Sequence, residues 1–527
     1  MHDWLAKART WLAGARAWLG SIRARLGSVP ARVRSLAGEH RLLWVALGAG
    51  AFVRLLVVIG YPGALWFAGD SYVYVGAALR LQPDLSKTTG YSLFLRLLEP
   101  LHSFIVVTCV QHLFGLAAGV MVYALARRAG VGERWSVAAA LPVLLDGYEI
   151  EDEHMVMAEA LFTVLVLAAL LLILWWRRPS WGLAVLAGVL IGYAVTVRSE
   201  GLPVLVLFPL AVVLRDWRRW RQWLAAGLMG AGCLAPVAGY AVWFHEHNGS
   251  YGLTRSDGFY LWGRVSSFAN CSVIKPPAYD LPICPAGTPS SRTPPGDFVW
   301  HAQNVRDLPG GPVTTASDTL LRDFAIRAVL AQPAGYARSV VHGLWLVVRW
   351  PREEYPDPGT VSYYKFKLKP QPIPADHSWI AGGTAYSDAV AYGHATPSRV
   401  VVPVATLLVL YQHVLYTYGP LLGLMLLLGL GGVLRVRSRP FAVRWWPSVR
   451  WCRRSGSMLP WATAVVLLVF PIATADFDYR YLLPVLPFAG LAVALAFAPI
   501  RSATDAKLDK WTTSSSAEPA GSSSSRA

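Results

Sequence analysis

Apolar runs near 20 residues in length recur along this chain of 527 residues, and such runs are long enough to cross a bilayer as helices. Short charged or proline-containing turns separate them. The composition agrees, since 54% of the residues are hydrophobic and the mean hydropathy is +0.41, which is high for a soluble protein. We therefore predict an all-α polytopic membrane protein with about ten spans. The candidate spans are 42–60, 103–126, 135–147, 156–176, 181–197, 202–214, 222–244, 402–434, 458–474 and 482–499.

Lysine and arginine gather in the turns on one side of these spans. With ten spans both termini lie on the same side, where the turns include "RRAGVGERW", "RDWRRWRQ" and 435–456, which holds seven arginines and no acid. By the positive-inside rule this side is the cytoplasm of a plasma membrane. The net charge of +17 then reflects this bias and contact with anionic lipids. Nucleic acid is a poor alternative partner, because the basic residues lie at span ends rather than on one folded face.

The chain divides by composition into five parts. Residues 1–41 repeat every seven positions, as in "WLAKART WLAGARA WLGSIRA", which favours an amphipathic helix at the cytoplasmic interface over a short coiled coil. The Ser-rich end is predicted to be disordered. The full division is 1–41, a membrane core 42–244 that includes the first outer loop 61–102, an extracytoplasmic segment 245–398, C-terminal spans 399–500 and a tail 501–527. The run 402–434 is long enough to hold an interfacial helix as well as a span.

Two charged residues in the first outer loop are candidates for chemistry. Asp70 lies where the chain leaves the membrane, and it is either the N-cap of a short helix or a carboxylate base at the membrane surface. Lys87 follows 17 positions later, and it is either a snorkelling interface lysine or a point charge for a phosphate.

The turn "LLDGYEIEDEHMVMAE" places six carboxylates between two apolar runs. Charge beside lipid is costly and tends to be functional, so we expect this turn to face the first outer loop. Asp146 and Asp152 are candidate substrate-binding residues. The side chains that could bind sugar hydroxyls or, with His154, a divalent ion are Glu149, Glu151, Asp152 and Glu153. The alternative is an ordinary solvated turn. We predict no resident cofactor and leave a divalent cation open.

Three arginines complete the set of candidate cations. Arg198 and Glu200 lie in the outer turn "RSEG", Arg255 lies in the extracytoplasmic segment and Arg480 lies in "DYRYLLPVLPF". Each arginine either holds a phosphate or pairs with a neighbouring acid, as Arg198 could with Glu200. Cys271 and Cys284, 13 positions apart, could form a disulfide in an oxidising exterior or remain free thiols.

The order of these features resembles the GT-C glycosyltransferases, which include the protein O-mannosyltransferases and the lipid A aminoarabinose transferases. The resemblance rests on a first span with an internal Arg54, then Asp70, Lys87, "GYSLFL", the acidic turn, "TVRSEGL" and "DYRYLLPVLPF". It covers the first six spans and the last hairpin, whereas 245–398 matches no one subfamily. Many members carry two acids where this chain has Asp70 and Ser71, so a second acid is absent or comes from elsewhere.

The resemblance implies transfer of a sugar, with inversion, from a polyprenyl-phosphate carrier to a glycan, lipid or protein acceptor on the extracytoplasmic face. It makes Asp70 the catalytic base and Lys87 a carrier-phosphate ligand. The chemistry agrees, because the leaving phosphate needs cations and the acceptor hydroxyl needs a base within about 3 Å. A lipid-linked sugar flippase and an O-antigen-ligase-like enzyme are the alternatives. A flippase would be expected to show internal repeats among its spans, and none is evident.

Overall fold

The computed structural model describes residues 38–67, 69–176, 180–375, 382–394, 399–434 and 456–498. Within these ranges the chain is helical and has no β-strand, only one isolated bridge between Leu65 and Met155, so the predicted all-α class is confirmed. The predictions for residues 1–37, for the arginine-rich turn 435–455 and for the tail lie outside the described residues.

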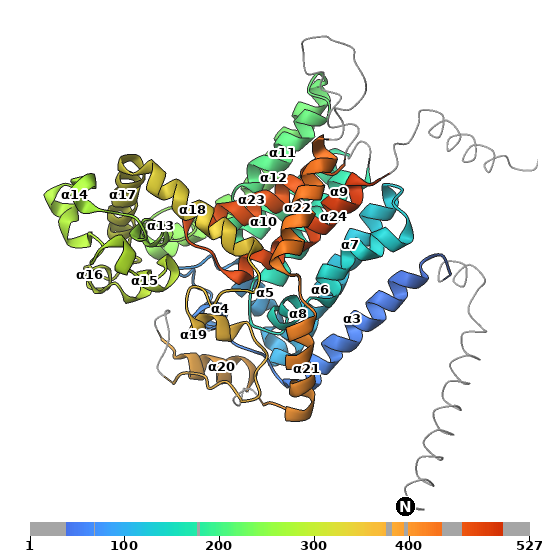
Figure 1. The fold of residues 1–527 in the computed structure, drawn as a ribbon, viewed down its shortest axis with the longest axis horizontal. Coiled ribbons are helices and arrows are strands. Elements are labelled where there is room, and N and C mark those ends of the chain that lie inside the picture. Colours follow the sequence, from blue (N-terminus) through green and yellow to red (C-terminus); the bar gives the residue numbers. More distant parts are fainter. Residues whose placement is uncertain are drawn as a thin grey trace, which may run out of the picture.

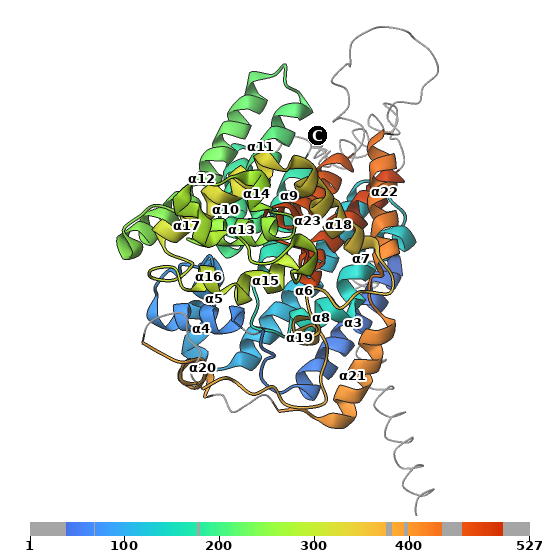
Figure 2. The same ribbon diagram turned by 60° about the vertical axis from the view of Figure 1, so that its left-hand side comes forward.

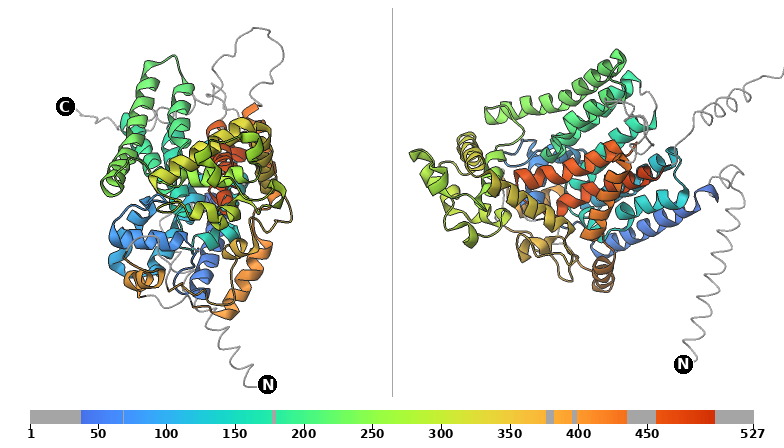
Figure 3. Two further views of the ribbon diagram at one scale, coloured as in Figure 1. Left: turned by 90° about the vertical axis from the view of Figure 1, so that its left-hand side faces the viewer. Right: turned by 45° about the horizontal axis from the view of Figure 1, so that its top comes forward.

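A bundle of apolar helices forms the body of the molecule (Figure 1). Figure 3 shows these helices side by side, with α11 and α12 extending beyond their neighbours. The bundle comprises α3 (Arg41–Gly60), α6 (Phe104–Arg128), α7 (Glu133–Leu145), α9 (Glu159–Trp175), α10 (Trp181–Val197), α11 (Val204–Arg215), α12 (Trp220–Asn248), α21 (Val402–Val414), α22 (Gly419–Leu434), α23 (Met458–Thr474) and α24 (Leu486–Ala496), which follows the 3-10 helix η7 (Tyr479–Val485).

Length and hydropathy test the predicted spans. Among the described residues, α3, α6, α12 and the continuous stretch Tyr479–Ala496 are each long and apolar enough to cross a membrane. Taken together, α21 and α22 are also long and apolar enough to cross a membrane, with a bend of 49° between them. This bend agrees with the expectation that 402–434 holds a second helix in addition to a span. The helices α9, α10 and α23 are apolar but shorter, with 17 residues each, so the predicted number of ten spans stays a prediction.

Small residues allow α10 and α12 to pack closely. A Cβ atom added to Gly188 would lie 2.2 Å from the carbonyl oxygen of Met229, and one added to Gly192 would lie 2.2 Å from that of Cys233. Helix pairs in a membrane gain little from the hydrophobic effect, so close backbone approach at small residues is their main source of packing energy.

The segment after α12 folds into a separate helical unit at one end of the molecule (Figures 1 and 2). Buried Phe259, Trp262 and Phe324 form part of its own hydrophobic core. Cys271 and Cys284 are joined by a disulfide in this unit, which confirms that alternative. The unit consists of α13 (Asp257–Ser266), α14 (Cys271–Ile274), η3 (Ala278–Ile283), η4 (Pro289–Ser291), α15 (Pro295–His301), α16 (Gln303–Arg306) and α17 (Thr315–Ala331).

Shorter elements connect this outer unit with the bundle. After α17 the chain continues into α18, which packs on α22 and α23. Gly69 is the N-cap residue of α4, at the point where the first outer loop enters this helix. Its φ of +83° is a left-handed conformation that residues other than glycine rarely adopt. The connecting elements are α4 (Asp70–Arg80), α5 (Gly90–Leu98), η1 (Glu99–Leu101), α8 (Gly147–Asp152), η2 (Ser199–Gly201), α18 (Pro333–Val348), α19 (Pro358–Tyr363) and α20 (Ala385–Gly393).

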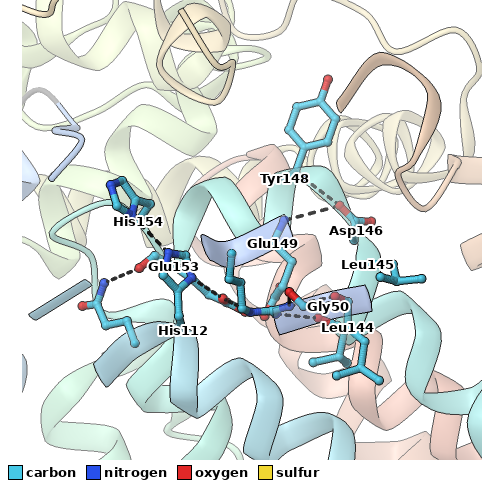
Figure 4. Close-up of polar contacts among 12 residues, drawn as sticks. Gly50, His112, Leu144, Leu145, Asp146, Tyr148, Glu149, Glu153 and His154 are labelled. Atoms are coloured by element: carbon cyan, nitrogen blue, oxygen red, sulfur yellow. Dashed lines mark hydrogen bonds and ion pairs between the residues drawn. The ribbon is translucent and has the colours of Figure 1, made fainter. Parts of the chain in front are cut away.

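A buried polar network holds the acidic turn against α3 and α6 (Figure 4). Arg54 donates to both carboxylate oxygens of Glu153, at 2.7 and 2.5 Å, and to the carbonyl oxygen of Leu144 at 2.8 Å. Nδ1 of His112 lies 2.8 Å from the same carboxylate. The arginine inside the first span is therefore a structural ion-pair partner of the acidic turn.

Hydrogen bonds through His112 and His154 extend this network to Tyr61. Nδ1 of His112 faces the Glu153 carboxylate, and Nε2 of His154 faces the carbonyl oxygen of Tyr61 at 2.8 Å. The two rings are joined by a contact of 3.0 Å between His112 Nε2 and His154 Nδ1. Burial lowers the pKa of His154 to about 3, which favours its neutral form.

Replacing Glu153 with glutamine is expected to destabilise the protein by about 3–5 kcal/mol, because Arg54 would then be a buried charge without its counterion. The two side chains are 3% and 0% exposed. The thermal midpoint of the detergent-purified protein measures this change. Glu99→Gln is the matched control, since its pair with Arg96 is 42% and 20% exposed and should contribute only about 0–1 kcal/mol. Equal midpoints for the two variants would contradict this structural role.

Candidate active site

The carboxylate of Asp70 lies between two cations that come from distant parts of the chain. Its Oδ1 is 2.9 Å from Nζ of Lys87, and its Oδ2 is 2.5 Å from Nη1 of Arg480. Asp70 is the first residue of α4, and its side chain pairs with these cations, while Gly69 occupies the N-cap position. The structure thus joins three residues that the sequence suggested separately, and neither the N-cap nor the snorkelling alternative describes their contacts.

Hydrogen bonds in the loop before α5 position Lys87. Oδ1 of Asp84 accepts from the backbone N–H groups of Ser86 and Lys87, at 2.7 and 3.1 Å. The hydroxyl of Thr88 donates to the carbonyl oxygen of Val197 at the end of α10, at 3.1 Å. These contacts fix the conformation of the loop and attach it to the bundle. The backbone that carries the ammonium group of Lys87 is therefore held in place.

Arg480 is held at the start of the last hairpin by three kinds of contact. Its Nε lies 3.1 Å from Oδ2 of Asp478, so the predicted local pairing is present alongside the pairing with Asp70. Its guanidinium also lies over the rings of Phe67, at 5.0 Å, and Tyr481, at 5.4 Å. A planar guanidinium held by ion pairs and by contacts with two rings keeps its remaining N–H groups in a defined direction.

The charges of this cluster favour the ionised carboxylate. Burial by itself would raise the pKa of Asp70, but the adjacent charges of Lys87 and Arg480 outweigh it and lower the pKa to about 2. Burial would likewise lower the pKa of Lys87, and Asp70 raises it above its ordinary value. Without another anion in the site, Asp70 is therefore an ionised counterion and a weak base.

Two cavities meet at this cluster. The first has a volume of about 310 Å³ and is lined by four cationic side chains, Lys87, Arg198, Arg322 and Arg480, against three carboxylates. The second has a volume of about 350 Å³ and is lined by two cationic side chains, those of Lys87 and Arg480, against three carboxylates. Both cavities border on Asp70, Ser86, Lys87, Tyr260, Ala475, Arg480 and Tyr481.

The first cavity also has an apolar side that extends toward the bundle surface. Phe470 and Pro471 of α23 line it together with Leu202, which is 36% exposed and lies between η2 and α11. A cavity with cations at one side and apolar side chains leading outward has the chemical character that an anionic lipid headgroup and its chain require.

Arg198 and Glu200 lie in the wall of the first cavity. Arg198 pairs with Glu159 of the acidic turn and, at 3.1 Å, with Glu200, so its predicted pairing is present. Its guanidinium also lies 5.8 Å from the ring of Tyr481. Arg198 therefore adds charge near the cluster while it ties α10 to α9.

The remaining acidic candidates lie outside the linings of both cavities. Asp146 is the N-cap of α8, where it accepts from Tyr148 N and Glu149 N, and it also accepts from Thr417 N at 2.6 Å (Figure 4). Asp152 is 3% exposed. Because all of the acids in this turn are buried, the solvated-turn alternative is wrong.

Burial dominates the electrostatics of the acidic turn. Burial raises the pKa values of Glu149, Glu151 and Asp152 well above their ordinary range, which favours their neutral forms. In the part of the chain that the structure describes, no group of three or more His, Cys, Asp or Glu side chains is arranged to hold a metal ion.

Arg255 is not brought to the cluster. Its guanidinium donates to the Ser250 hydroxyl at 2.6 Å and the Tyr251 carbonyl oxygen at 2.7 Å, and it lies over the ring of Phe244. These contacts fix the end of α12 to the outer unit, which is a structural role.

Sequence reasoning missed several residues of the two cavities. Arg322 and Tyr260 come from the outer unit, and Tyr74 comes from the second turn of α4. Arg322 lies in α17, and the sequence of this helix offers no sign of which turn lines the first cavity. The sequence analysis identified Glu159 only as one of the six acids of the acidic turn.

Comparison with known proteins bears on the class of enzyme. Residues 92–251 match the family model described as dolichyl-phosphate-mannose-protein mannosyltransferase. The matched residues are less than half of the chain. No curated protein sequence matches the chain. The matched region contains Arg198 and Glu200 but neither Asp70, Lys87 nor Arg480.

Two solved structures of an Archaeoglobus fulgidus oligosaccharyltransferase resemble the fold. One is the archaeal oligosaccharyltransferase AglB in complex with an inhibitory peptide and a dolichol-phosphate, at 12% identity and a TM-score of 0.38, covering 92% of this chain and 53% of that one. The other is the apo form, at 11% identity and a TM-score of 0.32, with the same coverage. The chain thus spans about half the length of these structures.

The described residues form a helical protein with several apolar helices long enough to cross a membrane, and residues 92–251 are similar to the mannosyltransferase family model. The family match confirms, over residues 92–251, the resemblance predicted from the sequence.

Proposed function

We propose that this protein transfers a sugar from a polyprenyl-phosphate carrier to an acceptor hydroxyl on the extracytoplasmic face of the plasma membrane, with Asp70 as general base. The observation that carries the proposal is the position of the Asp70 carboxylate between Lys87 and Arg480, where the two cavities meet. Release of polyprenyl phosphate from such a donor by the purified protein is the direct test.

The distribution of charge favours the first cavity as the donor site. Both cavities share Lys87 and Arg480, but only the first adds Arg198 and Arg322. A phosphate is most favourable where the cations outnumber the carboxylates. The apolar side formed by Leu202 and Phe470 then receives the first part of the polyprenyl chain.

Donor binding changes the state of the base. Lys87 and Arg480 hold the pKa of Asp70 low in the free protein. When a phosphate shares these cations, their charge is divided between two anions, and the effect of burial raises the pKa of Asp70. The carboxylate then becomes a better proton acceptor at the time when the donor is in place.

The transfer itself needs one base and fixed cations. The acceptor oxygen attacks the anomeric carbon while its proton passes to Asp70. The bond between that carbon and the phosphate oxygen breaks, and the oxygen leaves with the electron pair. Lys87 and Arg480 stabilise the charge that develops on the leaving phosphate. A single displacement of this kind inverts the anomeric configuration, and it requires only one carboxylate, which agrees with the Asp70–Ser71 pair.

The proposed orientation predicts which sites react with an impermeant maleimide in intact cells. We expect Ser290→Cys, on the exposed surface of the outer unit, to be labelled and Ser515→Cys, in the C-terminal tail, to be unlabelled until the cells are opened. A background with Cys109, Cys233 and Cys452 replaced removes the thiols outside the disulfide. Labelling of residue 515 alone would place Asp70 in the cytoplasm and contradict the proposal.

A further inference from the structure

The loop 475–478 connects α23 with η7 and leads directly to Arg480. It carries two aspartates that pair with different arginines. Asp478 pairs with Arg480 at 3.1 Å, whereas Asp476 pairs with Arg264 of the outer unit at 3.0 Å. The arginine that contacts Asp70 therefore follows closely, along the chain, a carboxylate that is held by the outer unit.

Three donors surround the Asp476 carboxylate. Nη1 of Arg264 in α13 lies 3.0 Å from its Oδ1, and the backbone N–H of Gly296 in α15 donates to its Oδ2 at 2.8 Å. The hydroxyl of Tyr355, in the segment between α18 and α19, lies 2.8 Å from both oxygens. Two helices of the outer unit and one connecting segment thus fix the side chain of Asp476.

Arg264 is a buried charge that depends on this carboxylate. It is 2% exposed, and its Nε and Nη2 have no hydrogen-bond partner within the described ranges. Asp476 is the acid with which it forms an ion pair. A buried charge that loses its counterion is strongly destabilising, so the position of Asp476 relative to α13 is tightly constrained.

Close contacts carry this constraint along the chain to Arg480. Phe477 is 1% exposed and packs edge to face against Tyr479 at 4.8 Å. Asp478 accepts from the backbone N–H of Arg480 at 3.2 Å and pairs with its Nε at 3.1 Å. Each residue between Asp476 and Arg480 is thus held by a contact of its own, so a shift of Asp476 would displace the guanidinium from Asp70.

We propose that Asp476 is a positioning residue: its pair with Arg264 holds the last hairpin where the Arg480 guanidinium reaches Asp70 and the donor phosphate. The inference rests on the proposed function and gives the outer unit a part in it. A guanidinium binds a phosphate well only when its planar N–H groups are aimed at the oxygens, so a small displacement of its backbone is costly. The competing explanation is that the pair only joins the outer unit to the bundle.

Binding of polyprenyl phosphate to the full-length purified protein tests this role without requiring turnover. We expect Asp476→Asn to weaken binding on the order of tenfold, the effect of losing one hydrogen bond to a charged group. Tyr355→Phe keeps the ion pair and removes one donor, so it should fold readily and weaken binding in the same direction by a smaller factor. Asp280→Asn is the matched control and should bind as the wild type does, because Asp280 is buried, pairs with Arg327 within the outer unit and lines neither cavity.

A double-mutant cycle shows whether Asp476 acts through Arg480. If it does, Asp476→Asn should have little further effect on binding in protein that already carries Arg480→Lys. The thermal midpoint should fall in both backgrounds, because Arg264 loses its counterion in either. Additive losses of binding would show that Asp476 acts independently of Arg480, and they would overturn the inference.

Cleavage of a polyprenyl-phosphate sugar is measured separately. If the wild type binds polyprenyl phosphate and Asp476→Asn weakens that binding through Arg480, but the donor is never cleaved, the proposed function fails and the positioning role stands. If the donor is cleaved and folded Asp476→Asn and Tyr355→Phe bind as Asp280→Asn does, the positioning role is overturned and the proposed function stands. Absence of binding by the wild type overturns both.

Discussion

Asp70→Asn is expected to lower the rate of sugar transfer by about 10²–10⁴-fold, because the acceptor proton would lose its base. Donor binding should persist or strengthen, since the phosphate would no longer compete with a carboxylate for Lys87 and Arg480. Single-turnover transfer measured beside donor affinity separates the two effects. Asparagine has nearly the same shape as aspartate, so the loss would be chemical rather than steric.

A stability measurement is the control for this variant. Removing the carboxylate leaves two buried cations without their counterion, so a lower thermal midpoint is expected even if Asp70 has no catalytic role. Asp388→Asn is a matched comparison, because Asp388 forms a double contact with Arg80 at 2.8 and 2.5 Å in the same outer region and lines neither cavity. Transfer by folded Asp70→Asn protein above about a tenth of the wild-type rate would remove Asp70 as the base.

Arg480→Lys is expected to raise the donor KM, lower kcat, or both, on the order of tenfold or more, and to leave the acceptor KM nearly unchanged. A hydrogen bond to a charged group is worth about 1.5–3 kcal/mol, and lysine cannot reproduce the planar fork that contacts Asp70 and Asp478 together. Donor titrations at saturating acceptor measure this change.

The competing explanation for Arg480 is that it only anchors the last hairpin through Asp478. That role would appear as lower expression or thermal stability, with a normal donor curve in the folded fraction. Arg255→Lys is a useful companion variant, because the guanidinium of Arg255 ties α12 to the outer unit away from both cavities. An unchanged donor curve for folded Arg480→Lys would take Arg480 out of the donor site.

The sequence predicted the helical class because lipid requires long apolar runs with satisfied backbone groups. It also identified Asp70, Lys87 and Arg480 one by one, each as a charge beside a span end. It could not show that one ion pair joins residues 410 positions apart, because only the packing of the last hairpin against the first outer loop creates that contact.

Burial explains where the sequence reasoning fell short. The acidic turn looked like a substrate-facing cluster, but Glu153 pairs with Arg54 inside the bundle and Asp146 caps α8. The sequence pattern marks such charges as costly without showing whether a span or a cavity lies beside them. The residues that the outer unit contributes to the cavities could not be anticipated either, because 245–398 has no periodicity that relates Tyr260 to Arg322.

The most direct measurement is the fate of a polyprenyl-phosphate sugar incubated with the purified protein in vesicles. Our account predicts release of polyprenyl phosphate in equal amount to the sugar transferred to acceptor or water, with inverted configuration at the anomeric carbon, and loss of this release in Asp70→Asn. Movement of intact donor between the two leaflets, without cleavage and without dependence on Asp70, would identify a flippase and contradict the account.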